Sequence, residues 1–389
     1  RNLPQVQNLR EVDIETRKES NMASLKVKAR VLKDVKIPNT EVFYGTTFKE
    51  WVADEKYYHH LIYFTTVMYN PNDGLIYCGL TAYDNDLLWT FDPETHQFSS
   101  CGYQSAGERF DVKIHRSLEL ARDGTIYGAT ACLHDLDQRA EAPGGKLFRY
   151  DPKTGKIEIL AIPTPHDYIQ TIALDDDRGI LYGFTYPVWK LFRYDIGSNR
   201  TKDFGYIGTG PHIPAIDDQG CVWGAWKDMY RRRDNLLCYD PETDEVTYFD
   251  YGMPHMSPVD IGAVDSMLNG GDGYLYIGTS AGALCRLDPK TAEVVYLGKP
   301  DPALRMPGLI LGKNGLLYCG TGAEGDSKLF AYDRESAKFI KLGRVYDPEI
   351  NDSSFILHHI TEADDGTIYT GETDNPRRSG YLWECKVKM

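Results

Sequence analysis

The stretch from His115 to Asp151 contains the unit from which most of this chain is built. It begins as a short apolar strand pattern, turns at Asp123-Gly124, runs on as Thr125-Ile126-Tyr127-Gly128, loops out, and returns as Leu147-Phe148-Arg149-Tyr150-Asp151. The glycine-led second strand is copied six more times along the chain. The copies begin at Gly74, Gly179, Gly220, Gly273, Gly315 and Gly366.

The spacing of these copies predicts the fold. From Gly74 to Gly366 the mean period is about 49 residues, within the range of propeller blades. Each copy holds short β-branched and aromatic segments separated by turn sequences such as Asp-Pro-Glu-Thr and Asp-Asp-Gly, a pattern typical of antiparallel hairpins. We therefore predict an all-β protein, a seven-bladed β-propeller.

The two ends of the chain indicate how the ring closes. The last copy ends at Met389 after three strands, so its sheet needs a fourth strand from elsewhere. Residues 23–36 largely alternate apolar and basic side chains, as an outer strand would. We expect this N-terminal strand to close the ring, with residues 1–22 as a polar extension and residues 23–389 as one propeller domain.

Charge and cysteine usage narrow the class of partner and compartment. With 57 acidic and 43 basic residues the formal net charge is −14, which repels nucleic acid and anionic membranes, so neither is expected as a partner. The eight cysteines do not form a disulfide pattern, and no run of about 18 apolar residues predicts a membrane span. Because the numbering starts at Arg1 rather than Met, we expect a secreted or periplasmic protein.

Histidines gather at one face of the predicted ring. In a propeller, the loop before each innermost strand and the loop between the second and third strands open on the same face. Nine of the ten histidines fall in or beside such loops, and His96 falls on the opposite face. The nine are His59, His60, His115, His134, His166, His212, His255, His358 and His359.

Tyrosine, tryptophan and arginine follow the same positions in the repeat. The corresponding loops of blades five and six carry no aromatic residue, so we expect a lopsided pocket with walls on blades two, three, four and seven. The predicted substrate-binding residues are Arg116, Arg231, Arg232, Trp226, Tyr230, Tyr83, His166 and Arg378. Arg231 and Arg232 belong to a run of three arginines that could equally be a solvated charge run.

This set of side chains suits one reaction class better than others. Glycoside hydrolysis in its usual form needs two carboxylates flanking the bond, and the predicted face offers mainly Glu372, Asp84 and Asp135. β-Elimination at a uronic acid needs a cation to neutralise the carboxylate, a base to remove the C5 proton, and an acid to protonate the departing oxygen. Histidine, tyrosine and arginine supply all three.

At these residues the chain resembles the seven-bladed propeller polysaccharide lyases, namely the ulvan lyases and the rhamnosyl-glucuronate lyases, and the related propeller rhamnosidases. The resemblance rests on His115, His134, Tyr168 and Arg231 or Arg232, since similar positions in that family hold a paired histidine, a catalytic tyrosine and carboxylate-binding arginines. It implies a polysaccharide lyase acting on an acidic polysaccharide or oligosaccharide.

The resemblance also implies roles for individual residues. His115 or His134 would remove the proton, and Tyr168 or Tyr186 would protonate the leaving oxygen. Arg116 or Arg232 would hold the carboxylate. The third blade departs from the family pattern, because its loop ends in Lys190 where an arginine is expected. That departure keeps a rhamnosidase-like glycoside hydrolase as an alternative.

The sequence also allows a metal site and two further functions. A divalent ion such as Zn, Mn or Ca is a candidate cofactor, because imidazole is a common metal ligand, and a hydrogen-bonded cluster is the alternative. No organic cofactor is expected. The candidate metal ligands are His59, His60, His212, His358 and His359. The other functions are a non-catalytic propeller that binds a sugar or protein, and a small-molecule lyase like the antibiotic-opening propellers.

Overall fold

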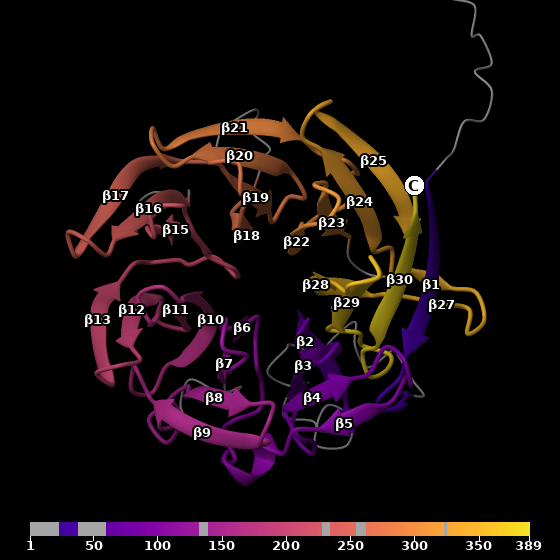
Figure 1. Ribbon diagram of the computed structural model, residues 1–389, viewed down its shortest axis with the longest axis horizontal. Helices are drawn as coiled ribbons and strands as arrows, with labels where there is room; N and C mark the ends of the chain where they lie inside the picture. The colour runs from indigo at the N-terminus through magenta and orange to yellow at the C-terminus, as the bar shows by residue number, and fades with distance from the viewer. Residues whose placement is uncertain (1–22, 38–59, 132–138, 228–233, 254–261, 323–324) are drawn as a thin grey trace, which may run out of the picture.

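The computed structural model describes residues 23–37, 60–131, 139–227, 234–253, 262–322 and 325–389. Seven four-stranded antiparallel sheets stand around a central axis, as Figure 1 shows. In each sheet the strands follow one another from the axis outwards, which confirms the predicted seven-bladed β-propeller. Among the described residues, no helix is long and apolar enough to cross a membrane.

Blades one to three follow the sequence order from the axis to the rim. Their strands are β2 (Ile62–Asn70), β3 (Leu75–Ala82), β4 (Leu88–Phe91) and β5 (Phe98–Ser100); β6 (Leu118–Leu120), β7 (Ile126–Ala129), β8 (Leu147–Asp151) and β9 (Lys156–Ala161); and β10 (Tyr168–Asp175), β11 (Ile180–Tyr186), β12 (Lys190–Asp195) and β13 (Arg200–Tyr206). A short 3₁₀ helix, η3 (Tyr103–Ser105), follows β5.

Blades four to six repeat the same order. Their strands are β14 (Ala215–Ile216), β15 (Val222–Trp226), β16 (Asn235–Asp240) and β17 (Glu245–Gly252); β18 (Val264–Asn269), β19 (Leu275–Thr279), β20 (Leu284–Asp288) and β21 (Glu293–Gly298); and β22 (Gly308–Leu311), β23 (Leu317–Thr321), β24 (Lys328–Asp333) and β25 (Lys338–Arg344). A small hairpin of β26 (Tyr346–Asp347) and β27 (Asp352–Ser353) leads into blade seven.

Blade seven joins the two ends of the described chain. It consists of β28 (Ile356–Glu362), β29 (Ile368–Thr373), β30 (Leu382–Lys388) and, outermost, β1 (Ser24–Arg30). β1 pairs antiparallel with β30 from Ser24 opposite Lys388 to Arg30 opposite Leu382, and Figure 1 shows the two strands side by side. The predicted closure of the ring by an N-terminal strand is confirmed.

The turns explain why the repeat folds into hairpins. The glycines that lead the second strands have φ between +64° and +92°, a region in which glycine has no Cβ clash. In the Asp-Pro turns the aspartate accepts a hydrogen bond from the amide two residues on: Glu94 N lies 2.8 Å from Asp92 Oδ1, and Lys153 N lies 2.9 Å from Asp151 Oδ1. Local sequence therefore sets each hairpin.

Apolar side chains fill the space between neighbouring blades. One cluster joins Phe64 and Ile76 of blade one to Ile126 and Phe148 of blade two, all fully buried. The cysteines in the strands belong to this packing, since Cys78, Cys285, Cys319 and Cys385 are buried free thiols. Packing of this kind holds the innermost strands in fixed positions, so side chains at their starts meet at defined distances. We call the side of the ring where the innermost strands begin the top face.

Candidate functional site

A network of polar groups at the top face draws on all seven blades. Side chains or carbonyl groups from blades that are not neighbours in the ring meet there, which is possible only near the axis. The contributors, in blade order, are Thr65, His115 with Arg116, Gln170, His212, Asp265, Arg305 and His358. We use the term axial cluster for His115, Arg116, His212, Asp265, Arg305 and His358, together with Lys113.

The carboxylate of Asp265 lies at the centre of the axial cluster. Its side chain is 1% exposed and accepts hydrogen bonds from Arg116 Nη1 at 3.1 Å and from Arg305 Nε and Nη2 at 3.0 Å each. His212 Nδ1 lies 2.9 Å from Oδ1. Burial opposes ionisation, but Arg116, His212 and Arg305 outweigh it and hold the pKa of Asp265 well below its ordinary value. Asp265 is therefore ionised at neutral pH.

Each axial histidine has one nitrogen fixed by an acceptor. His115 Nδ1 lies 2.7 Å from the carbonyl of Gln170, and His358 Nδ1 lies 2.7 Å from the carbonyl of Thr65. Because a carbonyl only accepts, Nδ1 of both rings carries the hydrogen, and so does Nδ1 of His212 against the Asp265 carboxylate. Nε2 of each neutral ring keeps its lone pair and can accept a proton.

The environment keeps these imidazoles neutral. Burial is the main cause that lowers the pKa of His115 and of His358 well below the ordinary histidine value, and the charge of Arg116 adds to it. Burial also lowers the pKa of His212, although Asp265 opposes the effect. The His115 ring lies 4.8 Å from the His358 ring and 5.6 Å from the His212 ring, measured between centroids.

Access distinguishes the three rings. The side chain of His212 is 34% exposed, whereas His115 and His358 are each 4% exposed. A substrate that approaches along the axis from the top face would therefore meet His212 first. His115 and His358 are nearly inaccessible.

Two cations of the axial cluster have free donor capacity. Nη2 of Arg116 is buried and has no partner among the described residues, which is costly unless a ligand or water fills the position. Lys113 is half-buried and its backbone bridges Thr81 of β3 and Ala131, just after β7. Burial lowers the pKa of its amine to about 8, with Arg116 and Arg305 adding to the shift and Asp374 opposing it. Both groups suit an anionic ligand.

Backbone strain coincides with this site. Arg116, Arg305 and Asp374 have φ of 43°, 66° and 54°, in the left-handed region that costs a side-chain-bearing residue of order 1–3 kcal/mol. A strained backbone persists only where the surrounding structure holds the residue in place, and such residues cluster at functional sites. Two of these three residues, Arg116 and Arg305, bond Asp265.

The predicted catalytic tyrosines lie together on blade three. The rings of Tyr168, at the start of β10, and Tyr186, at the end of β11, are 5.0 Å apart, and Trp189 lies edge-on to Tyr186 at 5.3 Å. Tyr168 comes two residues before Gln170, whose carbonyl holds His115. Tyr186 is 39% exposed. The three rings form an aromatic group on blade three, the blade that supplies the Gln170 carbonyl to the axial cluster.

Arg378 is placed differently from the prediction. Its guanidinium is 4% exposed and bonds Asp352 Oδ2 at 2.7 Å, Glu372 Oε2 at 2.9 Å and the carbonyls of Ser353 and Ser379. The charge is neutralised within blade seven, so Arg378 is not free to hold a substrate carboxylate. Glu372, expected at the working face, is fully buried in the same network.

Three other predicted substrate-binding residues lie away from the axial cluster. Trp226 donates its Nε1–H to the Phe249 carbonyl at 2.9 Å and packs on the outer strand β17. His166 is exposed, and its Nδ1 lies 2.8 Å from the Ala142 carbonyl. Tyr83 lines a separate pocket between blades one and two.

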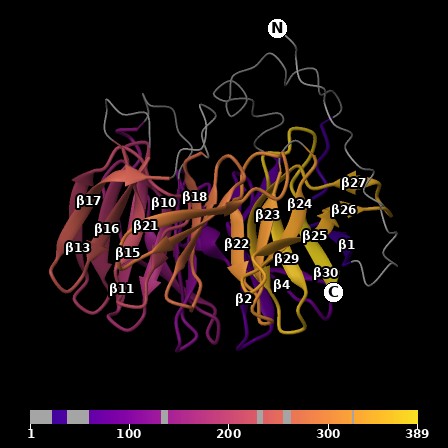
Figure 2. The same cartoon turned by 90° about the horizontal axis from the view of Figure 1, so that it is seen from above.

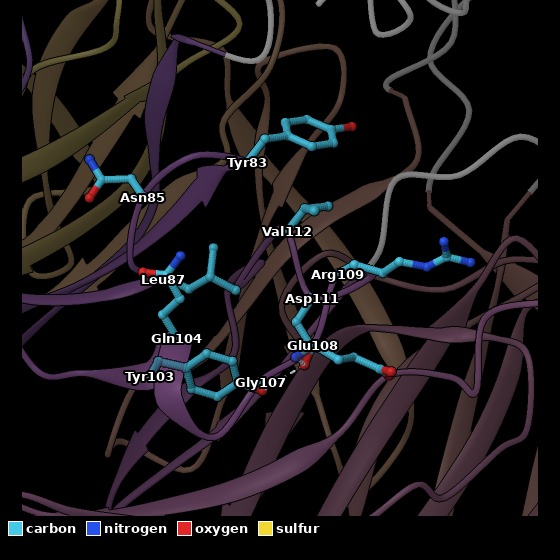
Figure 3. A pocket seen from close by; sticks show the side chains of 10 residues that line it. All are labelled: Tyr83, Asn85, Leu87, Tyr103, Gln104, Gly107, Glu108, Arg109, Asp111 and Val112. Carbon is cyan, nitrogen blue, oxygen red and sulfur yellow. Dashed lines mark hydrogen bonds between the residues drawn. The ribbon is translucent and has the colours of Figure 1, made fainter.

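That pocket has a volume of about 250 Å³, and Figure 3 shows the rings of Tyr83 and Tyr103 on separate sides of it. Its carboxylates already have a cation: Lys146 Nζ lies 2.7 Å from Glu108 and 2.8 Å from Asp111. Arg109 also lines the pocket, so two cations balance the two carboxylates and the pocket offers no net charge for an ionic ligand.

The candidate metal ligands that are described do not form one site. His60 is exposed and pairs with Asp84 at 3.1 Å, and His359 Nδ1 lies 2.9 Å from the Val67 carbonyl. Only His212 and His358 are axial, and the cations Arg116 and Arg305 beside them disfavour a metal ion. Within the described ranges, no group of three His, Cys, Asp or Glu is arranged to hold one. Metal binding stays a prediction.

Some predicted residues lie outside the described ranges. They are His59, His134, Tyr230, Arg231, Arg232 and His255.

The residues predicted from the sequence did not include Lys113, Asp265 or Arg305. The sequence also predicts that blades five and six contribute little, yet Asp265 begins blade five and Arg305 precedes blade six. Their position in the repeat is the feature that could have identified them. All three lie at or just before an innermost strand, as the histidines do.

Comparisons with known proteins support the fold. No protein-family model matches the chain, and no curated protein matches it. The extracellular domain of BT4673 from B. thetaiotaomicron aligns at 16% identity and a TM-score of 0.59, over 84% of this chain and 38% of that one. The chain thus spans well under half of that protein.

Two lyases align over almost their full length. A streptogramin B lyase has a TM-score of 0.62 at 13% identity, over 94% of this chain and 98% of that one. Virginiamycin B lyase from Staphylococcus aureus has a TM-score of 0.58 at 12% identity, over 93% and 99%. At such identities the likeness shows a shared β-propeller fold, and neighbours with this fold differ in function.

Proposed function

We propose that this protein is a carbohydrate-active lyase that cleaves an acidic oligosaccharide or polysaccharide by β-elimination at the axial cluster. The observation that carries the proposal is the pairing of His212 with Asp265 beside Arg116 and Lys113. It combines a neutral, oriented, accessible base with cations that have free donors, which are the two requirements for removing a proton next to a carboxylate.

His212 acts as the base in this scheme. Asp265 accepts the hydrogen of Nδ1, so the ring is held in one tautomer with Nε2 directed away from the carboxylate. Its lowered pKa keeps Nε2 unprotonated at neutral pH. We favour His212 over His115 for this role because His115 is nearly inaccessible.

Arg116 and Lys113 hold the uronate carboxylate. The free Nη2 of Arg116 can donate one charge-assisted hydrogen bond, and the Lys113 amine can donate another. When these cations neutralise the negative charge of the carboxylate, the neighbouring C5 proton becomes more acidic. In a buried site such preorganised cations act most strongly, because little water screens them.

The proposed elimination is balanced and needs no other reactant. The C5–H bond breaks as its proton moves to His212 Nε2, its electron pair forms the C4=C5 double bond, and the C4–O bond breaks. Tyr168 is the candidate that protonates the departing oxygen, since a phenol is protonated at neutral pH and Tyr168 comes two residues before Gln170, whose carbonyl bonds His115. Sugar rings of the substrate would stack on Tyr186 and Trp189.

Hydrolysis is less well supported by the described residues. A glycosidase of the usual kind needs a pair of carboxyl groups free to act on the bond. Asp265 is committed to Arg116, Arg305 and His212, and Glu372 is committed to Arg378. Asp84 pairs with His60 at the surface.

An absorbance assay separates these functions. The protein is incubated with a panel of uronic-acid polysaccharides, with and without chelator, while the ultraviolet band of the unsaturated uronate is followed. We expect absorbance to rise. Release of reducing sugar without absorbance would assign a hydrolase, and no product from any substrate would favour a sugar-binding propeller.

Location and partner follow from this function. Acidic polysaccharides lie outside the cell, and the BT4673 neighbour is described as an extracellular domain. We therefore propose a secreted or periplasmic enzyme whose partner is its acidic saccharide.

A further inference from the structure

A second, cationic pocket opens at the top face between blades six and seven. Its volume is about 440 Å³. It is lined by Lys36, Ile37, Gly325, Arg344, Asp352, Ser353, Phe355, Asn375, Arg377 and Arg378. We call it the rim pocket. Figure 2, in which the ring is turned by 90°, shows β25 to β27 and β1 on the same side of the ring.

The charge of the rim pocket is opposite to that of the chain. Four of its lining residues are cationic and one is a carboxylate, in a protein of formal net charge −14. Asp352 is already bonded to Arg378 at 2.7 Å. Arg344 Nε lies 3.4 Å from Asp326 and the Lys36 amine lies 3.5 Å from Asp34, so among the described residues Arg377 is the cation of the wall that has no carboxylate partner.

Two of these cations have free donors. Arg377 is exposed, and its side chain has no hydrogen-bond partner among the described residues. Lys36 is 66% exposed, with its amine 3.5 Å from Asp34. Arg344 is anchored more firmly, since its Nη2 bonds the Gly325 carbonyl at 2.6 Å and Ser353 Oγ at 3.1 Å. Arginine and lysine are the residues that bind carboxylate and sulfate groups best.

Hydrogen bonds hold several lining residues of the rim pocket in place. Glu372 Oε1 accepts hydrogen bonds from the Phe355 amide at 2.9 Å and from Asn375 Nδ2 at 2.8 Å. The Ile37 amide bonds the Arg377 carbonyl at 2.8 Å, so the segment after β1 is tied to the β29–β30 loop. A pocket with a preorganised wall loses less conformational entropy when a ligand binds.

The rim pocket and the axial cluster share one loop. Asp374 begins the loop and lies close enough to Lys113 and Arg116 that its charge opposes the lowering of their pKa values by burial, while Asn375 and Arg377 line the rim pocket. On the facing strand, Phe355 comes three residues before His358, so their Cα atoms are at most about 10 Å apart. One oligosaccharide can reach both.

We propose that the rim pocket is a second anion subsite, which binds a carboxylate or sulfate group on another sugar unit of the chain held at the axial cluster. The identity of the ligand rests on the proposed function. The pocket between blades one and two, shown in Figure 3, is a useful contrast, because its lining residues include two carboxylates, Glu108 and Asp111, and one cation, Arg109.

The test is a binding titration by calorimetry at low salt. Oligogalacturonates of two and of six units are titrated into the wild-type protein and the variant Lys36→Ala/Arg377→Ala. Both side chains are exposed, and the backbone hydrogen bond of Arg377 is retained in the variant. Lys290→Ala/Lys338→Ala is the matched control, since it removes the same charge from exposed hairpins on the opposite face.

We expect Kd for the six-unit ligand to rise about tenfold in the rim variant, equivalent to one lost charge-assisted contact. The two-unit ligand should bind all three proteins equally. No change for the six-unit ligand, or an equal loss for both lengths or in the control, would overturn the proposal. The titration measures binding without turnover. A protein that fails the absorbance assay but shows the length dependence would therefore support the anion subsite and contradict the proposed lyase activity.

A second arm identifies the anionic group. A six-unit carrageenan oligosaccharide carries sulfate without carboxylate, and cellohexaose carries neither. A rim-variant effect on the galacturonate alone assigns a carboxylate subsite, and an effect on the carrageenan assigns a sulfate-binding one. An equal effect on cellohexaose would contradict an anion subsite.

Discussion

His212 Nδ1 lies 2.9 Å from Asp265 Oδ1, so a ring on blade four is oriented by a carboxylate on blade five. The same oxygen also accepts from Arg116 and Arg305. One buried carboxylate thus orients the proposed base and holds the guanidinium groups beside it.

Replacing His212 tests the proposed base. We expect His212→Ala to lower kcat by about 10² to 10⁴, the usual contribution of a general base, and to leave the circular dichroism spectrum unchanged. His96→Asn is the control, because His96 lies on the opposite face at φ 58°, where asparagine is tolerated. A His212 variant with full activity would favour His115 as the base instead. For His115→Ala the sequence predicts the same decrease in kcat.

Replacing Asp265 tests its role as the common partner. Asp265→Ala leaves Arg116 without its buried partner, and breaking a buried ion pair in this way costs about 3–5 kcal/mol. Denaturant unfolding should show a loss of this size. Asp84→Ala, which breaks a pair exposed at 51%, should cost below about 1 kcal/mol. Equal losses would show that Asp265 is no more important than a surface charge.

The pH profile reports on Lys113. Its amine has a pKa of about 8 and binds the substrate only when charged, so kcat/KM should fall as the pH rises through about 8. Lys113→Arg should move this loss to higher pH, because arginine stays charged. An unchanged alkaline limb in that variant would exclude Lys113 as its source.

Buried histidines predict a loss of stability in acid. His115, His212 and His358 have folded-state pKa values below the ordinary 6.5, so below pH 6.5 the unfolded chain binds more protons than the folded one. Stability is therefore retained above pH 6.5 and decreases as the pH falls below it. The melting temperature should drop between pH 7 and 5, and less so in His358→Gln. A flat profile over this range would contradict the shifted pKa values.

Ring closure gives a prediction about stability rather than chemistry. Val27 of β1 is 4% exposed in the core of blade seven, whereas Lys26 beside it points outwards. Val27→Asp buries an unpaired charge, so we expect a loss of several kcal/mol in denaturant unfolding. Lys26→Ser should leave stability within about 0.5 kcal/mol. If both variants unfold alike, β1 does not close the ring in solution.

The fold was predictable because it is encoded locally and repeatedly. Each Gly-led strand and each Asp-Pro turn specifies its own hairpin, and seven copies leave one fourth strand to be supplied by residues near Ser24. The gathering of histidines at one face followed from the same repeat. None of this required knowledge of distances between blades.

The tertiary structure decided which of those side chains can act together. In the doublet His358-His359, a β-bulge interrupts the pairing of β28 with β29. Both rings bond carbonyl groups of blade one, His358 at Thr65 and His359 at Val67, but only His358 lies against His115 in the axial cluster. Asp265 and Arg305 join the site from blades whose loops looked uninformative, since side chains far apart in sequence meet only when the ring closes. Sequence by itself determined the ring and its working face, and packing around the axis determined the partners, burial and charge of each group there.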